Sequence, residues 1–342
     1  MDSDRLSPRQ SGKFIAERAE HIKFDEAAVQ KVAAMILDAA TNGELTQVQF
    51  AAQDVHPRGG GVAAIEWVFL LDTINFSFWP DEGSAWEITW KGTKQTGYFG
   101  ACAAVNIAME NGVPMTSAKW MSEVTAAELG PILRSSIEPY NDIPLLAERV
   151  KAVNESGKIL LEKFDGSFYN VVNQADGSCK RLLELIVENF PSFRDFAEYK
   201  GQKVSLLKRA QILVMDVYGA LEGQLDGKFG DLSELTMFAD YRVPQVMAYL
   251  GIFDYSEGLL EKLKNKVLLP NGSPEEVEIR GCSIAGCDRI YEAVQQLAEK
   301  CGQEHQKVTA GDIDVFLWMF RRKHAVEIEP RVPMHRTRCI YY

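Results

Sequence analysis

The chain has 342 residues, of which 46% are hydrophobic and 25% charged, so it contains enough apolar material for a large core. Its formal net charge is −11, and a negatively charged surface repels phosphate backbones, which argues against extended nucleic-acid binding as the main role. No run of about 18 apolar residues occurs and no hydrophobic segment follows the charged start, so neither a membrane span nor a secretory signal is predicted, and we expect a cytoplasmic location.

The first predicted elements are helices. Ser7–Gln10 has the pattern of a capping box with proline at the first helical position. Apolar residues between Val29 and Ala40 recur at three- and four-residue intervals, and Gly43 ends that pattern. A further apolar stripe between Ile65 and Thr73 predicts a buried helix.

One segment has the pattern of strands. Residues 86–90 alternate in polarity, Lys91 and Gly92 form a turn, and residues 93–99 return, which predicts a β-hairpin. Helical patterns then resume over residues 100–111, 125–135, 144–163, 178–189 and 205–222. Ser273–Glu276 has the pattern of another capping box, and helical patterns follow over residues 283–300 and 312–324. The expected fold is mainly α with a small β-hairpin element, a single compact domain over residues 1–342 with at most a weak division near residue 120.

The motifs of common cofactor and metal enzymes are missing. The six cysteines form no CxxC pair and, with the five histidines, no zinc-ligand spacing. The sequence has no P-loop, no dinucleotide-binding glycine pattern, no HExxH and no GxSxG. We therefore expect no cofactor and no metal, and carboxylate chemistry remains as the way such a chain would catalyse a reaction.

An unusual carboxylate lies in the segment Phe238–Gln245. Asp240 is flanked by aromatic residues, precedes Arg242 by two positions, and stands shortly before Pro244. The proline predicts that a helix begins there, with Asp240 in the turn that leads into it. Spacing alone leaves two interpretations open, and a helix-start aspartate paired with Arg242 is the more common of them; the other is a catalytic carboxylate.

Other charged residues also need a reason. Asp314 interrupts the apolar stretch 313–318, where a charge needs a ligand or a partner. The alternative is that Asp314 is a carboxylate near the N-terminus of a helix, where the helix dipole favours its charge. Lys208 and Arg209 open another predicted helix, either as phosphate-binding groups or as a solvated face. The C-terminal residues 335–342 are basic and aromatic, which predicts that they dock onto the body of the protein.

Several of these stretches resemble the queuosine salvage family, and the resemblance runs from Ser7 to Tyr342. The segments that carry it are Asp72–Trp79, Gly157–Phe164, Lys208–Val214, Phe238–Gln245, Val277–Ser283 and Arg338–Tyr342. Each is long and non-repetitive, so agreement by chance across all six is implausible.

The resemblance implies an activity, a fold and a set of site residues. Members of the family hydrolyse the N-glycosidic bond of queuosine 5′-phosphate to queuine and ribose 5-phosphate without a metal, in a helical fold similar to that of DNA glycosylases. Asp240 falls on the catalytic aspartate and Phe238 on an aromatic residue that contacts the base. Asp314 falls on a substrate-binding aspartate, and Val315 and Met319 on positions that contact the base.

Two positions depart from the family pattern. Some relatives carry an acidic residue where this chain has Met319, and a histidine where it has Gln53; here the nearest histidine is His56, three residues further on. Either other side chains make those contacts or the two positions matter less than the resemblance implies. The remaining predicted substrate-binding residues are Gln53, His56, Tyr241, Arg242, Lys208 and Arg209.

The chemistry of this bond assigns different tasks to the two aspartates. A carboxylate near C1′ stabilises the oxocarbenium-like transition state, attacks it, or activates water, and Asp240 is the candidate. Queuine is a 7-deazaguanine and lacks the N7 that an acid would protonate, so hydrogen bonds must reach its other edges; Asp314 is the first candidate for that, or for binding the amine of queuine. Candidates for holding the phosphate are Lys208, Arg209, Arg280 and Arg338, and aromatic candidates for enclosing the base are Phe238, Tyr241 and Trp79.

Two other functions stay open on the sequence. The chain is alternatively a glycosylase for another modified nucleotide, or a non-catalytic protein that binds queuine or a modified nucleotide. In the favoured interpretation it is a monomer that acts on a small molecule, with no stable nucleic-acid partner and no membrane association.

Overall fold

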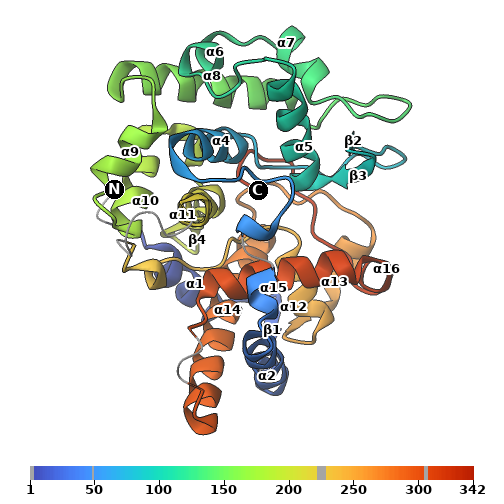
Figure 1. The fold of residues 1–342 in the computed structure, drawn as a ribbon. Coiled ribbons are helices and arrows are strands. Elements are labelled where there is room, and N and C mark those ends of the chain that lie inside the picture. Colours follow the sequence, from blue (N-terminus) through green and yellow to red (C-terminus); the bar gives the residue numbers. More distant parts are fainter. Residues whose placement is uncertain (1–3, 48–49, 222–228, 304–306) are drawn as a thin grey trace. The chain divides into compact units, whose positions relative to one another are not determined.

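The computed structural model describes residues 4–47, 50–221, 229–303 and 307–342 (Figure 1). Helices dominate the described residues, and the strands among them form three two-stranded antiparallel sheets. The chain divides into two compact units, each built from segments that are distant in sequence. The predicted mainly helical fold is therefore confirmed, whereas the expected single domain with a weak division near residue 120 stays a prediction.

The first unit covers Met1–Ala52, Asp195–Gln211 and Leu232–Arg338. Its helices and strands are α1 (Pro8–Ala16), β1 (Ile22–Phe24), α2 (Glu26–Thr41), α3 (Glu44–Gln47), η1 (Phe50–Ala52), β4 (Phe196–Tyr199), β5 (Gln202–Ser205), η3 (Leu232–Glu234), α12 (Val243–Tyr249), β6 (Phe253–Tyr255), α13 (Glu257–Lys264), α14 (Pro274–Cys301), α15 (Ala310–Lys323) and α16 (Ala325–Ile328). The first residues of α11 (Lys208–Ala220), up to Gln211, also belong to it.

The second unit covers Gln53–Arg194, Ile212–Asp231 and Cys339–Tyr342. Besides the rest of α11, its elements are α4 (Gly61–Thr73), β2 (Glu87–Trp90), β3 (Thr93–Thr96), α5 (Gly97–Glu110), α6 (Ala118–Glu123), α7 (Ala126–Ile132), α8 (Leu146–Lys163), α9 (Phe168–Gln174), α10 (Cys179–Asn189) and η2 (Pro191–Phe193). Pairing of Trp90 with Thr93 and of Glu87 with Thr96 confirms the predicted hairpin, but its second strand ends at Thr96 rather than at residue 99, because α5 begins at Gly97.

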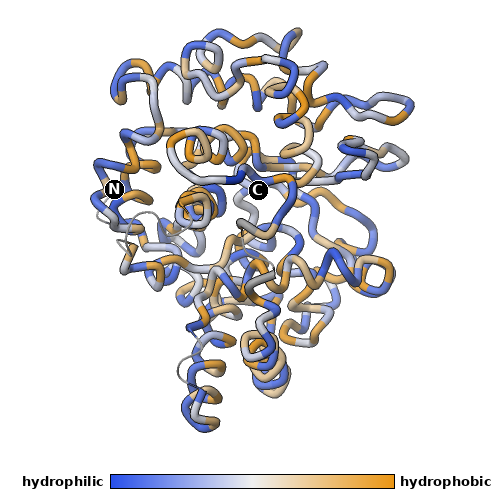
Figure 2. The backbone as a smooth tube through the Cα atoms, viewed as in Figure 1, coloured by the Kyte–Doolittle hydropathy of each residue, from blue (hydrophilic) through white to orange (hydrophobic). Residues whose placement is uncertain are grey.

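The long helix α14 organises the first unit. Ser273 caps its start by accepting a hydrogen bond from the backbone of Glu276, and Gly302 ends it in a left-handed conformation. Helix α1 crosses it closely at two glycines, Gly12 and Gly281. A Cβ atom on either glycine would collide with an isoleucine of the facing helix, so the lack of a side chain there permits the close approach. Beyond that crossing, hydrophobic and hydrophilic residues alternate along the C-terminal end of α14 (Figure 2).

The helix boundaries differ from the predictions at some ends. The helix predicted over residues 283–300 begins at Pro274, because the cap at Ser273 starts it earlier. The helix predicted over 205–222 is α11, from Lys208 to Ala220; the last predicted residue, Glu222, lies outside the described residues. The pairs β1–β6 and β4–β5 were not predicted.

The C-terminal residues dock onto the second unit, as predicted. The backbone N–H of Ser77 donates to the carbonyl oxygen of Tyr342 at 2.8 Å, and its hydroxyl donates to the carbonyl oxygen of Cys339 at 2.9 Å. Tyr342 is 1% exposed, so the end of the chain is part of the core of that unit. Among the described residues, we find no helix whose length and hydrophobicity would let it cross a bilayer.

Candidate active site

The segment that leads to Asp240 is buried but is neither helix nor strand. Buried backbone groups need partners, and here side chains supply them. The N–H of Thr236 donates to Oε1 of Gln211 at 2.9 Å, and the N–H of Phe238 donates to Oδ1 of Asp314 at 3.0 Å. Nε of Arg280 donates to the carbonyl oxygen of Ala239 at 2.8 Å. Side chains of α11, α15 and α14 therefore determine the path of the chain into Asp240.

The carboxylate of Asp240 uses its two oxygens differently. Oδ1 accepts hydrogen bonds from the backbone N–H groups of Arg242 and Val243, both at 2.8 Å. Oδ2 accepts no hydrogen bond from the residues that the structure describes, and the side chain is 8% exposed. Asp240 thus holds the start of α12, and a second oxygen remains available to a ligand.

The pairing of Asp240 with Arg242, which one of the two interpretations of the sequence included, is made through the backbone of Arg242. Backbone N–H groups bind the carboxylate, whereas Nη1 of Arg242 donates to Gln245 at 3.1 Å and to Glu329 at 2.8 Å. A carboxylate just before a helix is placed to accept exposed N–H groups of the first turn, which explains this choice of partner.

Asp314 shares an electrostatic environment with Asp240. Burial raises the pKa of Asp240, while the charge of Lys208 and the two N–H donors act in the opposite direction. Burial raises the pKa of Asp314 well above its ordinary value, and the charge of Asp240 raises it further. When two carboxyl groups interact, the better-stabilised anion ionises first. Asp240 is that anion, and Asp314 keeps its proton to higher pH.

Lys208 and Arg209 lie at the start of α11, and both are buried. The backbone N–H of Lys208 donates to Oδ2 of Asp195 at 3.0 Å, and its ammonium group is the strongest influence that lowers the pKa of Asp240. Lys208 is therefore close to the two carboxylates, where it favours the ionised form of Asp240.

Arg280, a sequence candidate for holding phosphate, is engaged in structural contacts. Its guanidinium group forms a two-pronged contact with Asp195 at 3.0 and 2.5 Å, and Nη1 lies 3.2 Å from Glu276. With Nε on Ala239 and a side chain that is 1% exposed, its donors point at protein groups. This arrangement makes Arg280 unsuitable as a phosphate ligand and assigns it to the support of the Asp240 segment.

Three arginines gather beside the carboxylates, and two of them were not predicted. Oε1 of Glu329 forms ion pairs with Arg242 and with Arg321. The guanidinium of Arg242 also lies over the ring of Tyr241, 5.2 Å from its centroid. Burial lowers the pKa of Arg321 to about 9, and the nearby charges of Arg242 and Arg322 lower it further. Arg321 and Arg322 look in the sequence like ordinary basic residues of a last helical turn.

The other predicted site residues divide between the two units. Phe238 is buried, and Val315 and Met319 are partly exposed one turn apart on α15, all in the first unit. Gln53 and His56 belong to the second unit, where the imidazole of His56 packs edge-on against several aromatic rings, those of Trp67, Tyr98 and Phe99. The role predicted for Gln53 and His56 in substrate binding stays a prediction.

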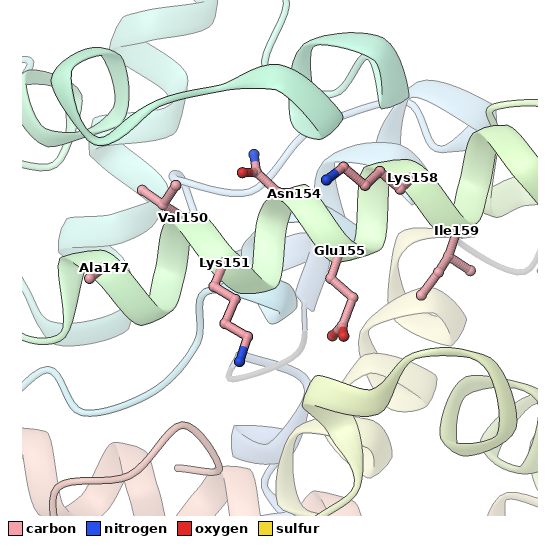
Figure 3. Close-up of a pocket in the computed structure, with 7 residues that line it drawn as sticks. All are labelled: Ala147, Val150, Lys151, Asn154, Glu155, Lys158 and Ile159. Atoms are coloured by element: carbon pink, nitrogen blue, oxygen red, sulfur yellow. The ribbon is translucent and has the colours of Figure 1, made fainter.

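One surface hollow lies along α8 in the second unit (Figure 3). Its lining residues are Ala147, Val150, Lys151, Asn154, Glu155, Lys158 and Ile159. Figure 3 shows Lys151 and Glu155 projecting to one side of the helix and Asn154 and Lys158 to the other. Without aromatic residues among these seven, the hollow has no surface for stacking a base. Within the described part of the chain, no three residues of the metal-ligating types come together in a way that would hold a metal ion.

The chain is similar to proteins of one family over nearly all its length. A family model described as Queuosine salvage protein matches residues 55–342. A mouse protein named Queuosine 5′-phosphate N-glycosylase/hydrolase is 45% identical over 338 residues, which cover 98% of this chain and 99% of the mouse chain. Proteins of the same name from Sphaerobacter thermophilus and Schizosaccharomyces pombe are 35% and 32% identical and also match almost end to end.

Proposed function

The chain belongs to the queuosine salvage protein family, and from that premise we propose that it is a queuosine 5′-phosphate N-glycosylase/hydrolase. It cleaves the N-glycosidic bond of queuosine 5′-phosphate and releases queuine and ribose 5-phosphate. The structural observation that supports this is the pair of buried carboxyl groups, Asp240 and Asp314, whose pKa values are raised to different degrees. Two carboxyl groups in unlike environments are the usual equipment for breaking glycosidic bonds.

Asp240 acts on the sugar. As the bond to the base breaks, positive charge develops on C1′ and the ring oxygen of the ribose. An ionised Oδ2, which accepts no hydrogen bond from the described residues, stabilises that charge, attacks C1′, or takes a proton from the attacking water. The charge of Lys208 favours the ionised form of the carboxylate against the effect of burial, and the two N–H donors on Oδ1 add to that effect and hold the carboxylate in place.

Asp314 acts on the leaving base. Negative charge develops on the 7-deazaguanine as it departs, and without N7 the base must be stabilised through its other polar edges. A carboxyl group that keeps its proton donates a hydrogen bond there, and the strong rise in the pKa of Asp314 supports this role. Its Oδ1 accepts the backbone N–H of Phe238, which orients the group beside an aromatic residue that is a candidate for stacking on the base.

The remaining parts of the proposal concern the surroundings of the reaction. Phe238, Tyr241, Val315 and Met319 bind the base, with Gln53 and His56 as further substrate-binding residues and Lys208, Arg209 and Arg242 near the sugar and phosphate. The enzyme uses no metal or cofactor, has a fold similar to that of DNA glycosylases, and works as a cytoplasmic monomer. The net charge of −11 supports a free nucleotide rather than intact tRNA as the substrate.

The test is direct. The protein is incubated with queuosine 5′-phosphate, and free queuine is followed by mass spectrometry. We expect release by the wild type and a loss of at least about 100-fold in Asp240→Asn, because the neutral amide stabilises no positive charge. Asp254→Asn makes the same change at an exposed position of the same unit and serves as the control.

Two results would overturn the proposal. The first is a folded wild type that binds queuine but releases none from the nucleotide, which would favour a carrier. The second is an Asp240→Asn variant with full activity. Parallel reactions with ordinary purine nucleotides separate this enzyme from a glycosylase of broader or different specificity.

A further inference from the structure

Two arginines converge on one anionic atom beside Asp240. Nη1 of Arg242, at the start of α12, lies 2.8 Å from Oε1 of Glu329, and Nη2 of Arg321, on α15, contacts the same oxygen. Arg322 is the next residue on α15, and its guanidinium lies over the ring of Trp318 at 5.2 Å. We call Arg242, Arg321 and Arg322 the arginine cluster.

Arg242 and Arg321 direct two positive charges at a single carboxylate oxygen, Oε1 of Glu329. Among the described residues, the ion pairs of Arg242 and Arg321 are both with Glu329. Burial lowers the pKa of all three arginines, and the charge of Arg242 lowers those of Arg321 and Arg322 further. Arginines that destabilise each other's charge in this way are stabilised by an added anion.

The spacing between the arginine cluster and the two carboxylates fits a nucleotide. Asp314 and Arg321 are seven residues apart on α15, so they share a face of the helix and are separated by about 10 Å along its axis. Arg242 follows Asp240 by two residues, and its backbone N–H binds that carboxylate. With a base at Asp314 and a ribose C1′ at Asp240, the arginine cluster lies within reach of a phosphate on the 5′ carbon of the sugar.

Glu329 occupies the position between the two guanidinium groups where another anion could bind, and its side chain is not held there firmly. Its side chain is 45% exposed, whereas those of Arg242 and Arg321 are 20% and 13% exposed. A half-exposed glutamate at the end of a short helix moves into solvent at little cost, while the two arginines stay where the surrounding side chains hold them. Guanidinium groups that meet on one carboxylate oxygen have the geometry to meet on a phosphate oxygen.

We propose that Arg242 and Arg321 bind the 5′-phosphate of the substrate by exchanging Glu329 for the phosphate group. This inference rests on the proposed function, because it takes the ligand to be the phosphate monoester of a nucleotide whose base and sugar occupy the sites at Asp314 and Asp240. It makes Arg321 the residue that distinguishes the nucleotide from the nucleoside. Two positive charges suit the dianionic phosphate, whereas the uncharged 5′-hydroxyl of queuosine leaves Glu329 in place.

The experiment compares Arg321→Gln and Arg242→Gln with Lys323→Gln, which removes a charge from an exposed residue of the same helix. The values of kcat and KM are measured for queuosine 5′-phosphate and for queuosine. Loss of one charge-assisted contact to phosphate lowers kcat/KM for the nucleotide by roughly 10- to 100-fold, mainly through KM. We expect kcat/KM for the nucleoside to change by less than about 3-fold in Arg321→Gln, and by less than kcat/KM for the nucleotide in Arg242→Gln, whereas Lys323→Gln should match the wild type for both. The ratio of the two substrates is internal to each protein, so partial unfolding does not imitate the effect.

Binding of inorganic phosphate, measured by calorimetry, gives a second and independent reading. It should weaken in Arg321→Gln and strengthen in Glu329→Gln, because the competing carboxylate is gone. Two arginine variants that keep the wild-type preference for the nucleotide would overturn the inference, as would unchanged or weaker phosphate binding in Glu329→Gln. If the wild type releases queuine from neither substrate, the proposed function fails, and the calorimetric arm still decides whether the arginine cluster binds phosphate.

Discussion

Replacing Arg280 tests whether the support beneath Asp240 matters for catalysis. The guanidinium group contacts Asp195 with two prongs, lies 3.2 Å from Glu276, and donates through Nε to the carbonyl oxygen of Ala239. A lysine keeps the charge but has neither the fork nor the Nε donor. Arg280→Lys therefore leaves the carbonyl before Asp240 without its partner, whereas Arg280→Met also leaves Asp195 and Glu276 buried without a cation.

The magnitude follows from these contacts. Leaving buried charges unpaired costs about 3–5 kcal/mol in Arg280→Met, and an unpaired buried carbonyl costs about 1–3 kcal/mol in Arg280→Lys. An unfolding entropy of about 2.1 cal/mol/K per residue gives roughly 0.7 kcal/mol/K for the 342 residues. The melting temperature should accordingly fall by roughly 4–7 °C in Arg280→Met and by about 1–4 °C in Arg280→Lys.

The decisive measurement is kcat at a temperature where both proteins are folded. A shift of about 1 Å in a catalytic group costs on the order of 100-fold, so we expect that loss in kcat for Arg280→Lys, with KM changed only a few-fold. Arg289→Lys is the matched control, because Arg289 lies on the same helix but forms an exposed pair with Glu26. If Arg280→Lys is less stable yet keeps the wild-type kcat, Arg280 supports the fold only and the positioning argument is refuted.

Three further predictions concern protonation and the C-terminus. Burial raises the pKa of Asp314 well above its ordinary value, so its proton is retained to a higher pH than that of an ordinary aspartate. Wild-type kcat should fall as the pH rises through that raised pKa, and Asp314→Asn should lower kcat and remove the fall; an unchanged fall would assign it to another group. Burial lowers the pKa of His335 to about 3, with the charge of Arg280 adding to the effect, so its contribution to stability is complete above pH 6.5 and declines below it by about 1.4 kcal/mol per pH unit. Urea unfolding at pH 7 and pH 5 should therefore show about 2 kcal/mol less acid destabilisation in His335→Gln than in the wild type, and equal losses would contradict this. Ser77→Ala removes the hydroxyl contact to Cys339 and should lower the free energy of unfolding by about 1 kcal/mol. A chain lacking Cys339–Tyr342 should lose several times that amount, and an unchanged free energy of unfolding in the shortened chain would refute the docking of this segment.

The sequence predicted the helices well because their signals are local. Periodic apolar residues and capping residues such as Ser7 and Ser273 lie within the elements they define. The pair β1–β6 joins Ile22 to Tyr255, and no local pattern encodes a partner that distant. The pair β4–β5 did have a local signal, because its turn repeats the Lys-Gly dipeptide of the predicted hairpin. Lys200 and Gly201 have φ values of 48° and 78°, close to the 49° and 78° of Lys91 and Gly92.

The sequence was sufficient to single out the two candidate carboxylates of the site, but not the residues that hold them in position. Asp240 and Asp314 could be singled out because a charge among apolar or aromatic neighbours is unusual, and the family resemblance then gave them roles. Arg280 could not be separated from a phosphate ligand, because Asp195 and Ala239 become its neighbours only in the fold. Arg321 was overlooked for a similar reason, since the Glu329 oxygen that it shares with Arg242 becomes its neighbour only where α12, α15 and α16 meet in the fold.

The two interpretations of Asp240 that the sequence left open turn out to be compatible. A helix-start aspartate and a catalytic aspartate were alternatives only as long as the carboxylate was treated as one group. In the structure Oδ1 performs the first task by accepting two backbone N–H groups, and those same bonds fix the direction of Oδ2 and oppose the rise in pKa that burial causes. A carboxylate that accepts two N–H groups at a helix start with one oxygen is held in place, and its ionised form is favoured, without the use of its second oxygen, which is what stabilising a developing charge requires. The commoner structural role is therefore the means by which the catalytic role that we propose is achieved.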